Sequence, residues 1–163
     1  MGQVRVRKLH PKIWSYIPAL MEALEHVSGP VLELGAGFGT FFMHWICEGR
    51  ELHTYESNEA YYELVRRCES PTHHIHHVTD WDDADIERPW GVALVDHAPP
   101  DRRRVEAARL VQYAQCILIH DSQWAAEKHY HYKRIYPLFK YRRSTLIRPK
   151  TTMLSNFVDV GAW

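Results

Sequence analysis

The sequence predicts an α/β fold, in which a mostly parallel β-sheet is covered by helices on both faces. Short apolar segments alternate with amphipathic ones along the chain, which is the order of strands and helices in such folds. The segments WGVALVD at 90–96 and CILIH at 116–120 are apolar on both sides, as buried parallel strands are. The last two expected strands are separated only by Arg148-Pro149-Lys150. They can therefore pair as a hairpin, which places one antiparallel strand in the sheet.

The elements follow one another in a regular order. Apolar residues recur at helical spacing from Ile13 to Val27, inside an N-terminal helical segment (residues 1–29) that Pro18 should divide or restart. Strands and helices then alternate to the end of the chain. The strands are expected at 31–34, 52–56, 74–78, 90–96, 116–120, 140–147 and 152–160, and the helices at 40–48, 58–69, 101–114 and 123–137.

Length and composition limit the classes of protein that fit. The chain has 163 residues, the size of one domain, and 45% of them are hydrophobic, which is enough for a continuous core. We therefore expect a single domain over 1–163, with its core in 30–163. Lys plus Arg number 20 and Asp plus Glu number 20, and this zero net charge argues against a general nucleic-acid binder.

The sequence has neither the pattern of a membrane span or secretory signal nor the cysteine spacing of a disulfide or metal site. No apolar run is long enough to cross a bilayer, and the basic N-terminus is not followed by the apolar stretch of a secretory signal. Cys47, Cys68 and Cys116 have neither metal nor disulfide spacing. We expect a cytoplasmic protein with reduced, packed thiols and no membrane partner.

A glycine-rich turn carries the strongest local pattern. In Glu33-Leu-Gly35-Ala-Gly37-Phe-Gly39-Thr40 a strand ends, glycines make the turn and a helix begins, so the backbone can approach a ligand closely. The spacing is G-x-G-x-G, not the G-x-G-x-x-G of dinucleotide sites. Glu56 ends the next strand, where a carboxylate can accept hydrogen bonds from both hydroxyls of a ribose. The alternative interpretation is a tight turn followed by an exposed glutamate.

These motifs resemble those of class I S-adenosylmethionine-dependent methyltransferases. The resemblance covers residues 30–160. VLELGAGFGTF is similar to the family's first motif and HTYES to its second, while PWGVALVDHAPP and CILIHDS are similar to its fourth-strand and fifth-strand motifs. It implies S-adenosylmethionine as cofactor. It also implies a three-layer α/β/α sandwich with a seven-stranded, Rossmann-like sheet whose last strand is antiparallel.

The resemblance also implies a set of cofactor-binding residues. The glycine loop would line the methionine and ribose parts, Glu33 would lie near the amino acid moiety, and Glu56 would hold the ribose. Asp80 and Trp81 would frame the adenine, although Trp81 could instead belong to the core. The full set is Glu33, Gly35, Ala36, Gly37, Phe38, Gly39, Glu56, Ser57, Asp80, Trp81 and Asp96.

Acids and histidines follow the fourth and fifth strands, at the sheet edge where ligands of open α/β folds bind. The candidate catalytic residues are Asp96, His97, His120 and Asp121. In one mechanism His97 or His120 is the general base that takes the proton of an acceptor hydroxyl. In the other, Asp96 and Asp121 hold Mg²⁺, which lowers the pKa of that hydroxyl. Asp121 could also cap a helix that starts at Gln123.

A partial resemblance to metal-dependent methyltransferases supports the mechanism with Mg²⁺. Val95-Asp96-His97 is similar to the corresponding stretch of catechol-type O-methyltransferases, which use a metal. Two positions depart from that group. Pro99 stands where its catalytic lysine is expected, and Ser122 stands in place of an asparagine ligand.

Residues after the fourth strand bear on the acceptor. Amino-group methyltransferases carry Asp/Asn-Pro-Pro-aromatic there, whereas this chain has Ala98-Pro99-Pro100-Asp101. The change favours an oxygen acceptor, a hydroxyl of a small molecule or a glycan. Arg102-Arg103-Arg104 could capture an anionic substrate or form a solvated helix face. The aromatic stretch from Trp124 to Tyr136 could line an acceptor pocket, with part of it packing on the sheet.

The run His73-His74-Ile75-His76-His77 stands apart from these motifs. On a strand, His74 and His76 point to one face and could bind zinc, but no Cys or acid nearby in the sequence completes a ligand set. A partly exposed strand near the sheet edge explains the run better.

Two other functions compete with catalysis of methyl transfer. A non-catalytic cofactor-binding or partner-binding module is possible on the same fold, because no sizeable insertion serves as a substrate lid. A nicotinamide-dependent oxidoreductase is disfavoured by the glycine spacing. A chain without a lid could close its pocket as a homodimer.

Overall fold

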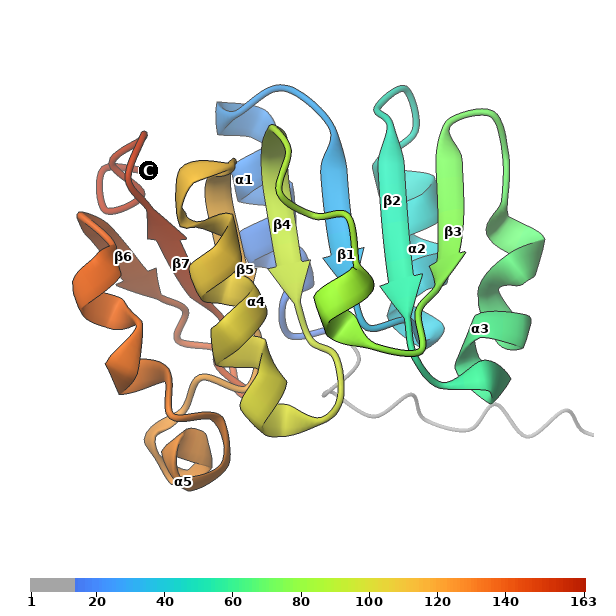
Figure 1. Ribbon diagram of the computed structural model, residues 1–163. Coiled ribbons are helices and arrows are strands. Elements are labelled where there is room, and N and C mark those ends of the chain that lie inside the picture. Colours follow the sequence, from blue (N-terminus) through green and yellow to red (C-terminus); the bar gives the residue numbers. More distant parts are fainter. Residues whose placement is uncertain (1–13) are drawn as a thin grey trace, which may run out of the picture.

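The computed structural model describes residues 14–163. Seven strands form one sheet in the order β3-β2-β1-β4-β5-β7-β6 (Figure 1). β7 runs antiparallel to both of its neighbours, and the other four pairings are parallel. The predicted mostly parallel, seven-stranded sheet with its terminal hairpin is confirmed. The strands are β1 Val31–Leu34, β2 Leu52–Glu56, β3 His73–His77, β4 Trp90–Val95, β5 Ala114–Ile119, β6 Tyr141–Ser144 and β7 Thr152–Ser155.

Helices cover both faces of the sheet, which explains why the central strands are apolar on both sides. α1 and α2 pack on one face through Leu20 and Met43, and α4 packs on the other through Ala107 (Figure 1). α3 lies beside β3 at the edge of the sheet. The three-layer arrangement predicted from the sequence is therefore present. The α-helices are α1 Ile17–His26, α2 Phe38–Ile46, α3 Glu59–Val65, α4 Arg103–Arg109 and α5 Glu127–Tyr130.

Pro18 marks the start of the helix α1 and does not interrupt it. α1 begins at Ile17, so Pro18 lies in the first turn, where a missing N–H costs no hydrogen bond. The extension of the helical pattern to Ile13 lies outside the described residues. α1 buries Leu20 and Ala23 against the sheet and ends before Ser28.

The helix predicted over 123–137 is wrong. The segment consists of short turns: the 3-10 turns Trp124–Ala126, Tyr132–Arg134 and Tyr136–Leu138, with α5 between the first two. His131 takes a left-handed φ of 53°, which ends α5, and Pro137 cannot continue a helix. The Tyr132 hydroxyl donates to the carbonyl of His120, so the aromatic residues tie this segment to β5.

Several element ends are shorter than predicted. α4 covers only the middle of the expected helix 101–114, with a 3-10 turn on each side. β7 ends at Ser155 and not at residue 160, because the Ser155 hydroxyl accepts from the N–H groups of Phe157 and Val158 and turns the chain.

Two further predictions are confirmed, one about the cysteines and one about the strand that carries the histidine run. Cys47, Cys68 and Cys116 are buried and unpaired. β3, which carries the histidine run, is an edge strand of the sheet. Between residues 14 and 163, no helix is both long and apolar enough to cross a membrane.

Candidate functional site

A cavity of about 290 Å³ opens at the carboxyl end of β1, directly at the glycine turn. Seven of the predicted cofactor residues line it, and they come from β1, the following turn, the start of α2 and the end of β4. These residues are Glu33, Gly35, Ala36, Gly37, Phe38, Gly39 and Asp96. Tyr16, Tyr61 and Leu94 complete the lining.

The three glycines of the turn have different physical roles. Gly35 has φ of +97°, and a Cβ there would lie 2.5 Å from the Cα of His97. A Cβ on Gly39 would lie 2.0 Å from the hydroxyl oxygen of Tyr16. A Cβ on Gly37 would meet nothing within 4 Å. Two glycines therefore allow close packing of the protein, and Gly37 leaves its backbone open to the cavity.

Glu33 is a buried carboxyl group at the base of the cavity. Its two oxygens accept hydrogen bonds from the hydroxyls of Thr40 (3.1 Å) and Thr54 (2.7 Å). Burial raises the pKa of Glu33 to about 8, and the negative charges of Asp96 and Glu56 act in the same direction. Glu33 and Asp96 both line the cavity, so a cationic group placed there would face two carboxyl groups.

Glu56 lies at the glycine turn, as predicted, but its carboxylate is held by backbone N–H groups. One oxygen accepts from Ala36 at 2.7 Å, and the other accepts from Ser57 at 2.8 Å and Asn58 at 2.6 Å. The side chain is 5% exposed. Glu56 thus joins the turn after β1 to the turn after β2, and the oxygen bonded only to Ala36 can accept a further hydrogen bond.

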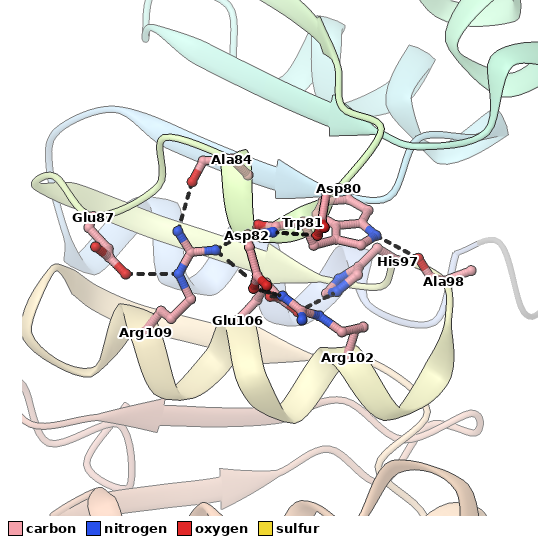
Figure 2. Close-up of polar contacts among 10 residues, drawn as sticks. All are labelled: Asp80, Trp81, Asp82, Ala84, Glu87, His97, Ala98, Arg102, Glu106 and Arg109. Atoms are coloured by element: carbon pink, nitrogen blue, oxygen red, sulfur yellow. Dashed lines mark hydrogen bonds and ion pairs between the residues drawn. The ribbon is translucent and has the colours of Figure 1, made fainter.

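Asp80 and Trp81 lie outside the cavity lining. Asp80 is exposed, and its carboxylate accepts from the N–H of Asp82 at 3.0 Å. Trp81 is 4% exposed, belongs to the core, and donates its indole N–H to the carbonyl of Ala98 at 2.8 Å (Figure 2). Of the two interpretations of Trp81, the structure agrees with the core residue.

Asp96, His120 and Asp121 come together at the rim, as their positions after β4 and β5 predict. The Nδ1 atom of His120 lies 3.1 Å from Asp96 Oδ1 and 3.8 Å from Asp121 Oδ2. Its Nε2 atom lies 2.8 Å from the hydroxyl oxygen of Ser15. Burial by itself lowers the pKa of His120, but the hydrogen bond and charge of Asp96 outweigh burial, so the pKa is raised.

His97 belongs to a different group of side chains. It is buried, and its Nε2 atom lies 3.0 Å from Glu106 Oε2 in a pair whose side chains are both fully buried (Figure 2). Burial lowers the pKa of His97, and Glu106 opposes that shift only in part. The imidazole packs against Trp81. Of the two histidines, His120 is therefore the one whose imidazole is hydrogen-bonded to a side chain of the cavity lining, Asp96.

Arg103 occupies the position between the rim acids where a metal ion would lie. Its Nη1 atom is 2.8 Å from Asp96 and 3.5 Å from Asp121, and its Nε donates to the carbonyl of His97 at 2.6 Å. The ligand atoms of Asp96, His120 and Asp121 are near enough to one another for a metal. A guanidinium already balances the two carboxylates, however, so this donor set does not fit Mg²⁺.

Two sequence interpretations at the rim are corrected. Asp121 does not cap a helix, because it has φ of 54° and Gln123 directly precedes the first turn. Arg102 and Arg103 do not form a solvated face. Arg103 is buried with the rim acids, and Arg102 is paired with Asp82 at 2.6 Å and Glu106 at 2.5 Å.

Sequence reasoning missed three residues of the site and the role of a fourth, Arg103, which it named only as part of the arginine run. Ser15 and Arg103 contact the rim, Glu106 holds His97, and Tyr16 covers the glycine turn. A glycine in the first turn of a helix indicates a close approach by another residue, so Gly39 could have pointed to a partner such as Tyr16. Nothing in the local sequence distinguishes Arg103 from its neighbours.

Comparisons with known proteins give similarity of structure only. No protein-family model matches the chain, and no curated protein matches it in sequence. Human methyltransferase-like protein 13, solved with S-adenosylhomocysteine, is similar over 92% of this chain and 83% of that chain, with a TM-score of 0.65 and 13% identity. An O-methyltransferase from Bacillus cereus, also solved with S-adenosylhomocysteine, is similar over 91% and 82%, with a TM-score of 0.60 and 9% identity.

A third similar structure is a longer protein. The bifunctional kinase-methyltransferase WbdD matches 92% of this chain with a TM-score of 0.61 and 13% identity, but the match covers 40% of the WbdD chain. The similarity to these three structures shows that this chain has the fold of class I S-adenosylmethionine-dependent methyltransferases. The antiparallel β7 inserted between β5 and β6 separates this sheet from the 3-2-1-4-5-6 order of dinucleotide-binding folds.

Proposed function

We propose that the chain binds S-adenosylmethionine in the cavity at the glycine turn and transfers its methyl group to a hydroxyl of a small molecule or sugar. The observation that carries the proposal is a cavity lined by the open backbone at Gly37 and by two carboxyl groups, Glu33 and Asp96, with Glu56 at the same turn. Glu33 and Asp96 face the ammonium group of the cofactor, and Glu56 accepts from its ribose.

His120 is the residue that takes the acceptor's proton. When bound, the cofactor supplies an electrophilic methyl group on a sulfonium. His120 Nε2 accepts the hydroxyl proton, and Asp96 holds the Nδ1–H and stabilises the imidazolium that forms. The Ser15 hydroxyl now occupies the hydrogen-bonding position at Nε2, so the acceptor replaces Ser15 there or delivers its proton through it.

The acceptor class follows from the chain after β4. Ala98-Pro99-Pro100-Asp101 offers no acid or amide in its first position and no aromatic ring in its last, so it cannot clamp an amine. The His120–Asp96 pair provides a proton acceptor, which a hydroxyl needs. The Tyr130 hydroxyl, which donates to Asp121 at 3.2 Å, and the ring of Tyr136 lie in the segment that would contact the acceptor.

Binding of S-adenosylhomocysteine tests the first half of the proposal. Titration calorimetry should show one site in the wild-type protein. Glu56→Ala should weaken binding roughly 10- to 100-fold, because the hydrogen bond that the ribose donates to a charged group is lost. Glu63→Ala is the matched control, since Glu63 is exposed and its ion pair is with Arg66, one helical turn away on the surface. Well-folded wild-type protein that does not bind S-adenosylhomocysteine would refute the proposal.

The raised pKa of Glu33 predicts a proton release on binding. With a pKa of about 8, this carboxyl group is mostly protonated at pH 7. A cationic ammonium beside it favours the ionised form and lowers its pKa, so the proton leaves. Calorimetry at pH 7 in two buffers of different ionisation enthalpy should give different heats. Glu33→Gln should remove most of that difference between the two buffers. If the difference is unchanged, the released proton comes from another group.

A non-catalytic binding module is the second candidate, and Arg103 is the observation that favours it. Its guanidinium fills the space between Asp96 and Asp121 on the acceptor side of the rim. A module would bind S-adenosylhomocysteine as above without transferring a methyl group to any compound in a panel of phenols and sugars. Transfer of a methyl group to one of these compounds would show that the protein is an enzyme and not a binding module.

A further inference from the structure

We propose that Glu51, His53 and His74 form a zinc-binding site at the amino-terminal ends of β2 and β3. The site lies at the opposite end of these strands from the cavity at the glycine turn. The three residues bring one ligand atom each into a group whose members lie within 4.8 Å of one another. Glu51 Oε1 is 2.7 Å from His53 Nε2 and 3.9 Å from His74 Nε2.

Strand pairing explains why these residues meet. β2 and β3 are parallel, and His53 lies directly beside His74 in the register. The two imidazole rings are 4.6 Å apart, on the same face of the sheet. Glu51 comes two residues before His53, so both point to this face. The histidine run lacked an acid nearby in the sequence, and the neighbouring strand supplies one.

The chemistry of these three groups is that of a zinc site. Two imidazole nitrogens and one carboxylate are a ligand set that Zn²⁺ uses in three-ligand sites, where water takes the fourth position. Mg²⁺ and Ca²⁺ prefer oxygen ligands and do not suit two imidazoles. His53 is buried, whereas the side chains of His74 and Glu51 are 39% and 51% exposed, so one side of the group is open to solvent.

A second histidine fixes the orientation of His53. His76 Nε2 lies 2.9 Å from His53 Nδ1, with the two rings stacked at an interplanar angle of 4°. A zinc ligand that binds through Nε2 carries its proton on Nδ1 and donates it to a nearby acceptor. His76 is that acceptor, and it leaves His53 Nε2 directed at Glu51.

Arg88 opposes metal binding in the same place. Its Nη2 atom lies 2.9 Å from His53 Nδ1, and its guanidinium lies over the ring of Trp90 at 4.5 Å. When Arg88 donates to Nδ1, the proton of His53 is on Nε2, where it blocks the metal. Zinc binding therefore requires Arg88 to release His53 and the ring proton to move to Nδ1.

Calorimetric titration of untagged, chelator-treated full-length protein with Zn²⁺ tests the site. The wild-type protein should bind one equivalent with saturation. His74→Gln and Glu51→Gln should each weaken that binding at least about tenfold. Both side chains are half-exposed, and unchanged melting temperatures without zinc will show that the variants fold. Arg88→Gln should bind zinc more tightly than the wild-type protein, a result that general surface binding would not give.

Two variants control for the other histidines and acids. His44→Gln removes a histidine that pairs with His73 on the opposite face, and Asp121→Asn removes a member of the rim group. Neither substitution should change the binding of the one equivalent of Zn²⁺. A Co²⁺ absorption spectrum that His74→Gln abolishes would assign the ligands independently. Absence of saturable binding, or binding that depends on Asp121 and not on His74, would overturn the proposal.

Discussion

His120→Gln is expected to lower the rate of methyl transfer by about 10²–10⁴-fold, the usual contribution of a general base. His120 is the histidine at the rim that is hydrogen-bonded to Asp96, and glutamine cannot take up the acceptor's proton. The affinity for S-adenosylhomocysteine should change little, because His120 does not line the cavity. Transfer of a labelled methyl group to the most active compound of the acceptor panel is the measurement.

The pH dependence of the rate should identify His120 as the general base more specifically than the loss of rate in His120→Gln does. The pKa of His120 is raised because Asp96 outweighs the effect of burial, so the wild-type rate should rise with pH through a value above the ordinary 6.5. Asp96→Asn removes the opposing charge and leaves burial, which lowers the pKa. The rising limb of the pH–rate profile should therefore move to lower pH in Asp96→Asn.

His26→Gln is the matched control, since His26 is an exposed histidine in the last turn of α1, outside the segment that would contact the acceptor. It should leave both the rate and the pH profile unchanged. Full turnover in His120→Gln would rule out the general-base role and leave positioning as the source of catalysis.

The fold was predictable because its determinants are local. Alternating apolar and amphipathic segments gave the order of strands and helices, and the turn at Gly35 to Gly39 marked where the ligand cavity opens. The end of β2 at Glu56 was predicted to the residue. Such features depend on a few neighbouring residues, whose backbone requirements are visible in the sequence.

The contacts of the site were less predictable because they join distant elements. Asp96 and His120 were placed at one rim, since the carboxyl ends of parallel strands meet. Arg103 lies in a run of three arginines, and only the packing of α4 directs it between Asp96 and Asp121. Likewise Glu51 completes a histidine group on a neighbouring strand, which no spacing within one segment reveals.

Glu106→Ala is expected to destabilise the protein by about 1–3 kcal/mol, the cost of leaving a buried polar group without its hydrogen-bond partner. The Glu106 side chain is fully buried, with one oxygen 3.0 Å from His97 Nε2 and the other 2.5 Å from Arg102 (Figure 2). Without it, His97 keeps no side-chain hydrogen bond among residues 14–163, and Arg102 keeps its ion pair with the exposed Asp82. The melting temperature should fall by roughly 5 °C.

Glu87→Ala is the control, because Glu87 forms an ion pair with Arg109 at the surface, at 2.8 Å (Figure 2). Such exposed pairs contribute about 0–1 kcal/mol. Denaturant unfolding of both variants measures the difference, and equal losses would show that burial of Glu106 has no special weight.

The double variant His97→Leu/Glu106→Leu separates two explanations of that loss. If the stability came from the attraction between the two groups, removing both would cost as much as removing Glu106 alone. If the loss in Glu106→Ala comes mainly from leaving buried polar groups unpaired, the double variant should recover part of it, because two apolar side chains fill the space and no imidazole is left without a partner. Arg102, which is partly exposed, can turn to Asp82 in either case. We expect the partial recovery, since the desolvation of a buried pair offsets most of its attraction.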